Sequence, residues 1–272
     1  MRRSRTGHMT WAAVVVAGTG IALALTGTPA GAHMPYVLPS TFEAGARKQV
    51  TIEAAFGEDA FRPEIGMRDA PFEITGPDGM TTRLDTPALL TDMTIVEAPL
   101  ARDGLYRLSS GQRLGRMNKM YREGGAWKIA GEDGEVPAGA AIVTAQSTTL
   151  ADAYVLHGRP GSMAALKPRG TALEIHPLGD PSAYGAKEAA TFEILYRGRP
   201  LAGTLVTLFR EAGYYDGTKQ VIELKTDTAG RVSLTPPDAG RYLMLVRHRD
   251  AAPAGAAAPY YSYTVTLAFQ AM

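Results

Sequence analysis

Alternation of apolar and polar residues with a period of two recurs along this 272-residue chain and restricts its fold more than any other feature. Such alternation is typical of β-strands that are buried on one side. It is clearest in residues 49–56, 190–196 and 261–269. No segment sustains a helical period over about 11 residues, the shortest window that would indicate an amphipathic helix. The pattern therefore predicts an all-β protein built from β-sandwiches rather than an α/β fold.

The first 32 residues have the composition of a cleaved signal peptide. Three arginines lie within the first five residues, an uncharged apolar stretch covers residues 11–25, and Ala30-Gly31-Ala32 forms a small-residue cleavage site. The apolar stretch is shorter than the roughly 20 residues that a spanning helix needs. No cysteine follows it, which excludes a lipoprotein anchor. We expect a periplasmic or secreted protein that begins at His33 and has no membrane span after processing.

The net charge and the cysteine content of the mature protein exclude some kinds of partner and some kinds of site. Loss of the three leader arginines leaves 25 basic against 27 acidic residues. A nearly neutral protein has no global field that would attract nucleic acid, so a nucleic-acid partner is excluded. The absence of cysteine also rules out disulfides and thiolate metal sites.

The mature chain is long enough for two domains. Residues 158–170 are rich in glycine, proline and basic residues, as linkers are. We therefore expect an N-terminal β-sandwich domain over 33–165 and a C-terminal one over 170–272, each immunoglobulin-like or prealbumin-like. Tyr106 and Tyr242 each follow a glycine turn, an arrangement typical of immunoglobulin-like sandwiches in which the hydroxyl bonds back to the backbone.

His33 is the strongest candidate ligand because cleavage would free its α-amino group beside its own imidazole. Amine and imidazole nitrogens of one residue can chelate one metal ion, and a further imidazole would complete a set that suits Cu(II) or Ni(II). The alternative is that His33 is a solvated terminus with no ligand.

Two further histidines lie beside carboxylates and are candidate metal ligands. Glu174 and His176 share one side of an expected strand, and His248 lies two residues before Asp250. Each pair offers either a ligand with a neighbouring carboxylate or only a polar strand face. For His157, at the expected domain junction, we expect a loop role.

Several segments resemble the NikM-like family of periplasmic proteins associated with nickel uptake, many members of which are labelled a domain of unknown function. The start Ala32-His33-Met34-Pro35 is similar to the opening of that family. Further similar segments are Leu173-Glu174-Ile175-His176-Pro177-Leu178, Arg197-Gly198-Arg199-Pro200-Leu201-Ala202-Gly203, Thr226-Asp227-Thr228-Ala229-Gly230 and Gly240-Arg241-Tyr242. The resemblance implies a periplasmic transition-metal role, with nickel or cobalt favoured, copper as an alternative, and an envelope metal transporter or receptor as partner.

Three functions remain in order of preference. The first is a metal-binding accessory protein that uses His33 with His176 or His248. The second is a non-catalytic glycan- or protein-binding module in which aromatic strand ends hold the partner, including Tyr214, Tyr215, Tyr260 and Tyr261. The third is a copper oxidase that binds its metal through a histidine brace. No hydrolase or phosphate-binding motif is present, so we expect no enzyme.

The basic residues between Arg113 and Arg122 predict a solvated hairpin, or a surface for an anionic partner.

Overall fold

The computed structural model describes residues 33–85, 87–131 and 135–272. The expected signal peptide, residues 1–32, lies outside the described residues. Strands dominate the described part and confirm the all-β, sandwich-type fold predicted from the alternation. The short helical segments are η1 (Ala164–Leu166), η2 (Pro181–Ala183) and α1 (Gly213–Asp216).

The strands form three sheets, of which the first is the N-terminal sheet. Its strands are β1 (Met34–Pro39), β3 (Gln49–Gly57), β4 (Ile65–Gly66), β7 (Ala88–Leu89) and β8 (Thr94–Pro99). They pair antiparallel in the order β1, β3, β8, β7, and β4 pairs with β3 beside that path. Because β1 is an edge strand, its prolines Pro35 and Pro39 remove no ladder hydrogen bond that the sheet needs.

The central sheet combines strands from both halves of the chain. Its main path is β17 (Gln220–Lys225), β16 (Leu205–Arg210), β19 (Gly240–Ala251), β20 (Tyr260–Ala271), β12 (Val143–His157), β9 (Gly104–Ser109), β5 (Glu73–Thr75) and β6 (Thr81–Arg83). Beside this path lie β2 (Glu43–Gly45), β10 (Arg113–Glu123) and β11 (Ala126–Ile129). The third, C-terminal sheet contains β13 (Leu173–Pro177), β14 (Ala190–Tyr196), β15 (Arg199–Pro200) and β18 (Arg231–Leu234).

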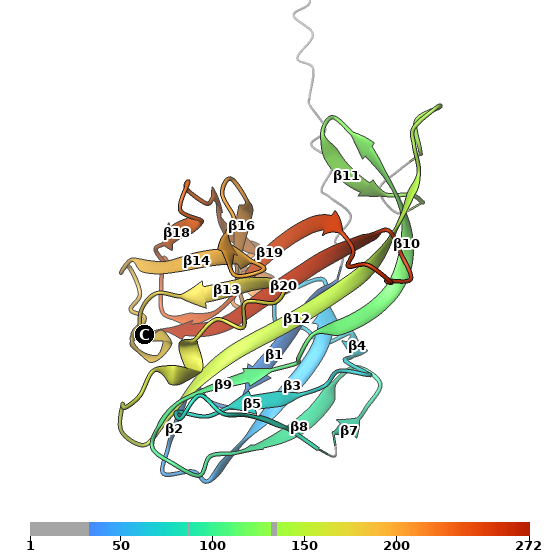
Figure 1. Ribbon diagram of the computed structural model, residues 1–272. Coiled ribbons are helices and arrows are strands. Elements are labelled where there is room, and N and C mark those ends of the chain that lie inside the picture. The colour runs from blue at the N-terminus through green and yellow to red at the C-terminus, as the bar shows by residue number, and fades with distance from the viewer. Residues whose placement is uncertain (1–32, 86, 132–134) are drawn as a thin grey trace, which may run out of the picture.

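The middle strands of the central sheet are buried on both faces, so the described part of the protein has three layers (Figure 1). Along β19, Leu243 and Leu245 pack into the core shared with the N-terminal sheet. The alternate residues Tyr242, Met244 and Val246 pack into the core shared with the C-terminal sheet. Successive side chains of a strand point to opposite faces, which explains why β19 is apolar on both sides where it crosses the middle of the molecule.

The two expected domains share this central sheet. Strand β12 of the first half pairs in parallel with β20 of the second, from Ala145 opposite Tyr260 to Ala153 opposite Ala268. The predicted boundary between residues 165 and 170 lies in the connection from β12 to β13. The division into domains 33–165 and 170–272 stays a prediction, and the structure adds that the two segments are joined by continuous strand pairing.

Both predicted tyrosine turns are present, with the expected hydrogen bonds. The hydroxyl of Tyr106 donates to the carbonyl of Arg102 at 2.9 Å, and that of Tyr242 donates to the carbonyl of Asp238 at 2.8 Å. Each bond spans four residues and ties the turn to the strand that follows it.

The basic segment between Arg113 and Arg122 forms a hairpin, as predicted. Strand β10 pairs antiparallel with β11, and the hairpin extends beyond the layered body (Figure 1). The Arg122 guanidinium lies over the ring of Trp127 at 5.2 Å, which holds its charge against the hairpin's own aromatic side chain.

Candidate metal centre

His33 lies immediately before β1, and the pairing of β1 with β3 determines its neighbours. In this antiparallel register Met34 is opposite Gly57, so His33 lies beside the loop that follows β3. That loop, residues 58–64, returns at once to β3 through β4. Both ends of the loop therefore meet at the end of β3, next to His33.

The loop is a tight turn that depends on Gly57. A Cβ atom on Gly57 would lie 2.0 Å from the carbonyl oxygen of Arg62, so no larger residue fits without moving the backbone. Phe61 adopts a φ of 59°, which is unusual for a bulky residue, and its ring packs edge-on against Tyr36 with centroids 5.5 Å apart. Backbone outliers of this kind persist where the surrounding packing fixes them, and they gather at ligand sites.

The three candidate ligands are His33, Glu58 and Glu64. The Nε2 atom of His33 lies 2.9 Å from Oε2 of Glu64. The other oxygen of Glu64 accepts the backbone N–H of Glu58 at 3.2 Å. One ligand atom from each side chain lies within 4.8 Å of the other two. The side chains of His33 and Glu64 are 38% and 41% exposed, so a cation can reach them from solvent.

The buried Tyr36 and the half-buried Glu53 form a hydrogen-bonded pair on β1 and β3, the two strands that position this group. The Tyr36 hydroxyl donates to Oε1 of Glu53 at 2.5 Å. Burial, and then the carboxylate of Glu53, raise the pKa of Tyr36 far above its ordinary value. Tyr36 therefore stays a neutral donor that fixes the start of β1 beneath His33.

The loop 58–64 is also tied to the C-terminal half of the chain. Asp59 pairs with Lys219 at 2.7 Å. The Arg62 guanidinium lies 4.1 Å from the ring centroid of Tyr214. These contacts join the loop to the connection between β16 and β17, so both halves of the chain position Glu58 and Glu64.

The donor chemistry fits a divalent transition metal. Imidazole nitrogen suits nickel, copper and zinc. Carboxylate oxygens add negative charge, and they are not the soft ligands that select Cu(I). Among the described residues, His33, Glu58 and Glu64 form the only group of three histidine or acidic side chains this close together.

Glu174 and His176 lie apart from that group and have other partners. Both oxygens of Glu174 accept backbone N–H groups, from Arg169 and Gly170, each at 2.6 Å. His176 lies opposite Glu193 on the neighbouring strand, with its Nδ1 atom 3.5 Å from that carboxylate. Glu174 thus holds the chain entering β13, which is a structural role.

His248 and Asp250 also belong to the C-terminal half. The His248 ring lies against Tyr196 with centroids 4.5 Å apart, and burial lowers the pKa of His248. Burial alone would raise the pKa of Asp250, but the backbone N–H of Ala251 and the charge of Arg197 lower it. Of the five predicted site residues, His33 alone belongs to the three-residue group.

Glu58 and Glu64 were not found from the sequence. Only the register of β1 on β3 would have indicated them. In that register Met34 lies opposite Gly57, and Glu58 directly follows Gly57, so it lies beside His33. Alternation locates each strand but does not state which strands pair, and therefore does not bring His33 and Glu64 together.

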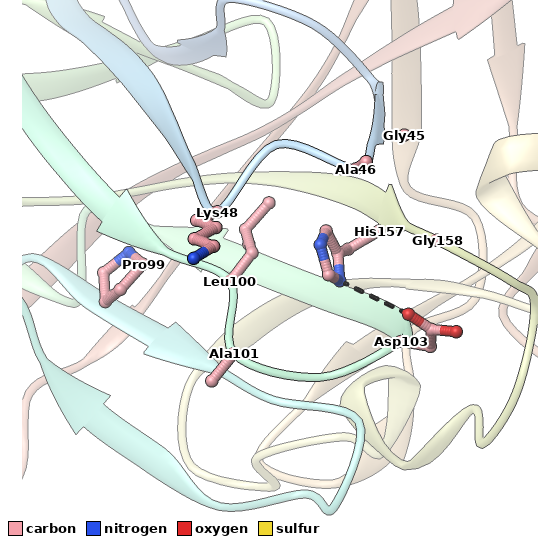
Figure 2. A pocket seen from close by; sticks show the side chains of 9 residues that line it. All are labelled: Gly45, Ala46, Lys48, Pro99, Leu100, Ala101, Asp103, His157 and Gly158. Atoms are coloured by element: carbon pink, nitrogen blue, oxygen red, sulfur yellow. Dashed lines mark ion pairs between the residues drawn. The ribbon is translucent and has the colours of Figure 1, made fainter.

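A separate pocket of about 530 Å³ lies at the opposite end of β3, beside His157 (Figure 2). The His157 Nδ1 atom is 2.8 Å from the carbonyl of Arg102 and 3.9 Å from Asp103. A carbonyl only accepts, so Nδ1 donates and Nε2 is the free nitrogen. Lys48 and the buried Leu100 line the other side, so the expected loop histidine lines a concave, mixed-charge surface.

The family described as Domain of unknown function (DUF4198) matches residues 30–250. The chain belongs to this family. No curated protein matches the chain. In the described part of this DUF4198 chain, no helix is long and apolar enough to cross a membrane.

Several solved structures are similar to this DUF4198 chain at low identity. The D0–D1 domain of intimin is 12% identical, with 85% of this chain and 95% of that chain covered and a TM-score of 0.21. The Yersinia pseudotuberculosis adhesin InvE is also 12% identical, with 89% and 61% covered and a TM-score of 0.23. A DUF4785 family protein from Legionella pneumophila is 11% identical, with 78% and 50% covered and a TM-score of 0.24. At these scores the similarities carry no argument about function.

Proposed function

We propose that this protein is a periplasmic accessory protein that binds a transition metal at its mature N-terminus, for nickel or cobalt uptake or for copper handling. His33 supplies the imidazole and, once the leader is removed, the amine. An envelope metal transporter or receptor is the partner. The resemblance to NikM-like proteins supports nickel or cobalt, and the donor types support copper equally.

One observation carries this proposal: the side chains of His33, Glu58 and Glu64 meet at a single exposed point. The two carboxylates add negative charge beside the chelating residue, which favours a divalent cation over a neutral ligand. Among the described residues no other histidine has two acidic partners within the same distance. In the proposal the groups that lie beside His33 are Glu58 and Glu64, and not His176 or His248 as expected from the sequence.

Calorimetric titration of protein beginning at His33 with Ni(II), Co(II) and Cu(II) tests this function. The matched control carries an acetyl group on the His33 α-amine, which turns the amine into an amide, adds no new amine and leaves every side chain in place. We expect the control to bind at least about tenfold more weakly, a difference of about 1.4 kcal/mol. Binding no tighter than millimolar by the processed protein would refute the proposal.

A glycan- or protein-binding role is the second candidate, and two exposed tyrosines favour it. Tyr214 and Tyr215 are 43% and 77% exposed, and their rings lie 5.3 Å apart. Tyr261, expected to belong to the same surface, is instead buried in the second core. Glycan binding that disappears in Tyr215→Ala would support this candidate. The copper oxidase stays a prediction, which oxidised sugar products from copper-loaded protein would test.

A further inference from the structure

The contact between His33 and Glu64 determines which imidazole nitrogen can bind a cation. A carboxylate accepts hydrogen bonds and donates none, so the 2.9 Å contact requires the hydrogen to be on Nε2 of His33. In the neutral ring, Nδ1 then carries the free lone pair. The ring nitrogen nearer the main chain is therefore the one available as a ligand.

Glu64 is itself held in place, so this preference is built into the loop. Its second oxygen accepts the N–H of Glu58 at 3.2 Å. Its backbone N–H donates to the carbonyl of Phe56 at 3.0 Å, which anchors the residue to β3. The backbone and the carboxylate of Glu64 are thus both held by hydrogen bonds in the metal-free protein.

Nδ1 and the α-amine of one histidine can close a six-membered ring with a cation, whereas Nε2 points away from the main chain. We propose that Glu64 is a positioning residue that holds His33 as the Nε2–H tautomer and so directs Cu(II) or Ni(II) to Nδ1 and the amine. This inference rests on the proposed function. A carboxylate that accepts the outer N–H of a ligating histidine fixes the ring and makes it a better ligand.

The competing arrangement places the cation at Nε2, directly between Glu58 and Glu64. The two arrangements make opposite demands on the hydrogen of Nε2, which must be kept in the first and removed in the second. They also differ in their need for the amine, which takes part in the first alone. The two arrangements can therefore be distinguished by measuring which ring nitrogen carries the hydrogen and whether the amine binds the cation.

The tautomer is measured in metal-free processed protein by long-range ¹H–¹⁵N NMR of the His33 ring, with three variants. We expect the Nε2–H tautomer in the native protein and a loss of that preference in Glu64→Ala. Glu64→Gln keeps an acceptor oxygen and should restore it. Glu58→Ala removes a neighbouring carboxylate of the same loop and should leave it unchanged. A native Nδ1–H tautomer, or equal effects of Glu58→Ala and Glu64→Ala, would overturn the inference.

Electron paramagnetic resonance with Cu(II) alone gives the second measurement. We expect coupling to two nitrogens in the native protein, and binding about 10–100-fold weaker in Glu64→Ala, the usual loss when such a supporting bond is removed. Cu(II) coupled to one nitrogen, with affinity unaffected by acetylation of the His33 amine, would place the cation at Nε2 instead. If no metal binds, the proposed function fails, and the NMR result still decides the role of Glu64.

Discussion

Arg169 binds both carboxylate oxygens of Asp152, with its Nη1 atom 2.8 Å from Oδ2 and its Nη2 atom 3.0 Å from Oδ1. Asp152 lies on β12 in the central sheet, and Arg169 lies in the connection from β12 to β13. Nη2 also donates to Ser109 at 2.8 Å. This paired contact holds the connection between the two predicted domains against the central sheet, where water cannot compete for the charges.

Replacing Arg169 should therefore destabilise the protein strongly. Arg169→Ala leaves the carboxylate of Asp152, 6% exposed, without the guanidinium that binds both of its oxygens. We expect the free energy of unfolding to fall by about 3–5 kcal/mol, the usual cost of breaking a buried pair on one side. Urea denaturation measures it. The control Arg159→Ala removes the exposed partner of Asp103 and should cost less than about 1 kcal/mol. Equal losses in the two variants would contradict the assigned role of the buried pair.

The same pair predicts a specific dependence of stability on pH. Burial alone would raise the pKa of Asp152, but the charge and hydrogen bonds of Arg169 outweigh it and hold the pKa below its ordinary value. A carboxyl with a lowered folded-state pKa adds its full stability above its unfolded pKa of about 3.9 and loses it as the pH falls through the folded-state value.

Urea denaturation of native protein and Asp152→Asn at pH 7 and pH 3 tests this dependence. The advantage of the native protein over the variant should be largest at pH 7 and smaller at pH 3. Because all other titrating groups are common to both proteins, their difference isolates Asp152. A difference that is the same at both pH values would contradict the prediction.

Gly57→Ala should disrupt the metal centre without altering any candidate ligand. The added Cβ would lie 2.0 Å from the Arg62 carbonyl, so loop 58–64 must move. We expect a loss of about 1–3 kcal/mol in stability and weaker Ni(II) and Cu(II) binding in calorimetry. Gly179→Ala is the matched control, because a Cβ there meets nothing within 4 Å. Unchanged metal affinity in Gly57→Ala would show that the loop shape is irrelevant to binding.

Local patterns were sufficient to predict the strands and the tyrosine turns, but not the way the layers are assembled. The alternation of residues 190–196 identified β14 because its period follows from the backbone alone. The run Tyr242–Val246 also belongs to a strand, yet both of its faces are buried, since β19 lies in the middle layer. Which strands lie between two others depends on pairings such as that of β12 with β20, which join distant segments and leave no local signal.

The candidate site shows the same division between local and long-range information. His33 was identified because its chemistry depends on one residue and one cleavage. Glu58 and Glu64 were missed because their position depends on the register of β1 on β3. Glu174 and His176 were expected to act together from their spacing, but the chain entering β13 uses both oxygens of Glu174 for backbone N–H groups.

The tyrosine turns offer a final prediction, in which the two halves of the chain should respond differently. Tyr242 is fully buried, and its one hydroxyl hydrogen is shared between two acceptors of Asp238, the carbonyl oxygen at 2.8 Å and a carboxylate oxygen at 2.5 Å. The Tyr106 hydroxyl contacts only the backbone of Arg102, donating to the carbonyl and accepting the N–H. Removal of a hydroxyl from a buried bond costs about 1 kcal/mol, and more when a charged acceptor is involved.

We therefore expect Tyr242→Phe to lower the free energy of unfolding by about 1.5–3 kcal/mol and Tyr106→Phe by about 0.5–1.5 kcal/mol. Tyr215→Phe is the control, because its ring is 77% exposed and its loss should stay within about 0.5 kcal/mol. Thermal and urea denaturation of the three variants measure which of them loses the most free energy of unfolding. If Tyr242→Phe is no more destabilising than Tyr215→Phe, the hydroxyl does not hold the turn, and ring packing alone accounts for the tyrosine.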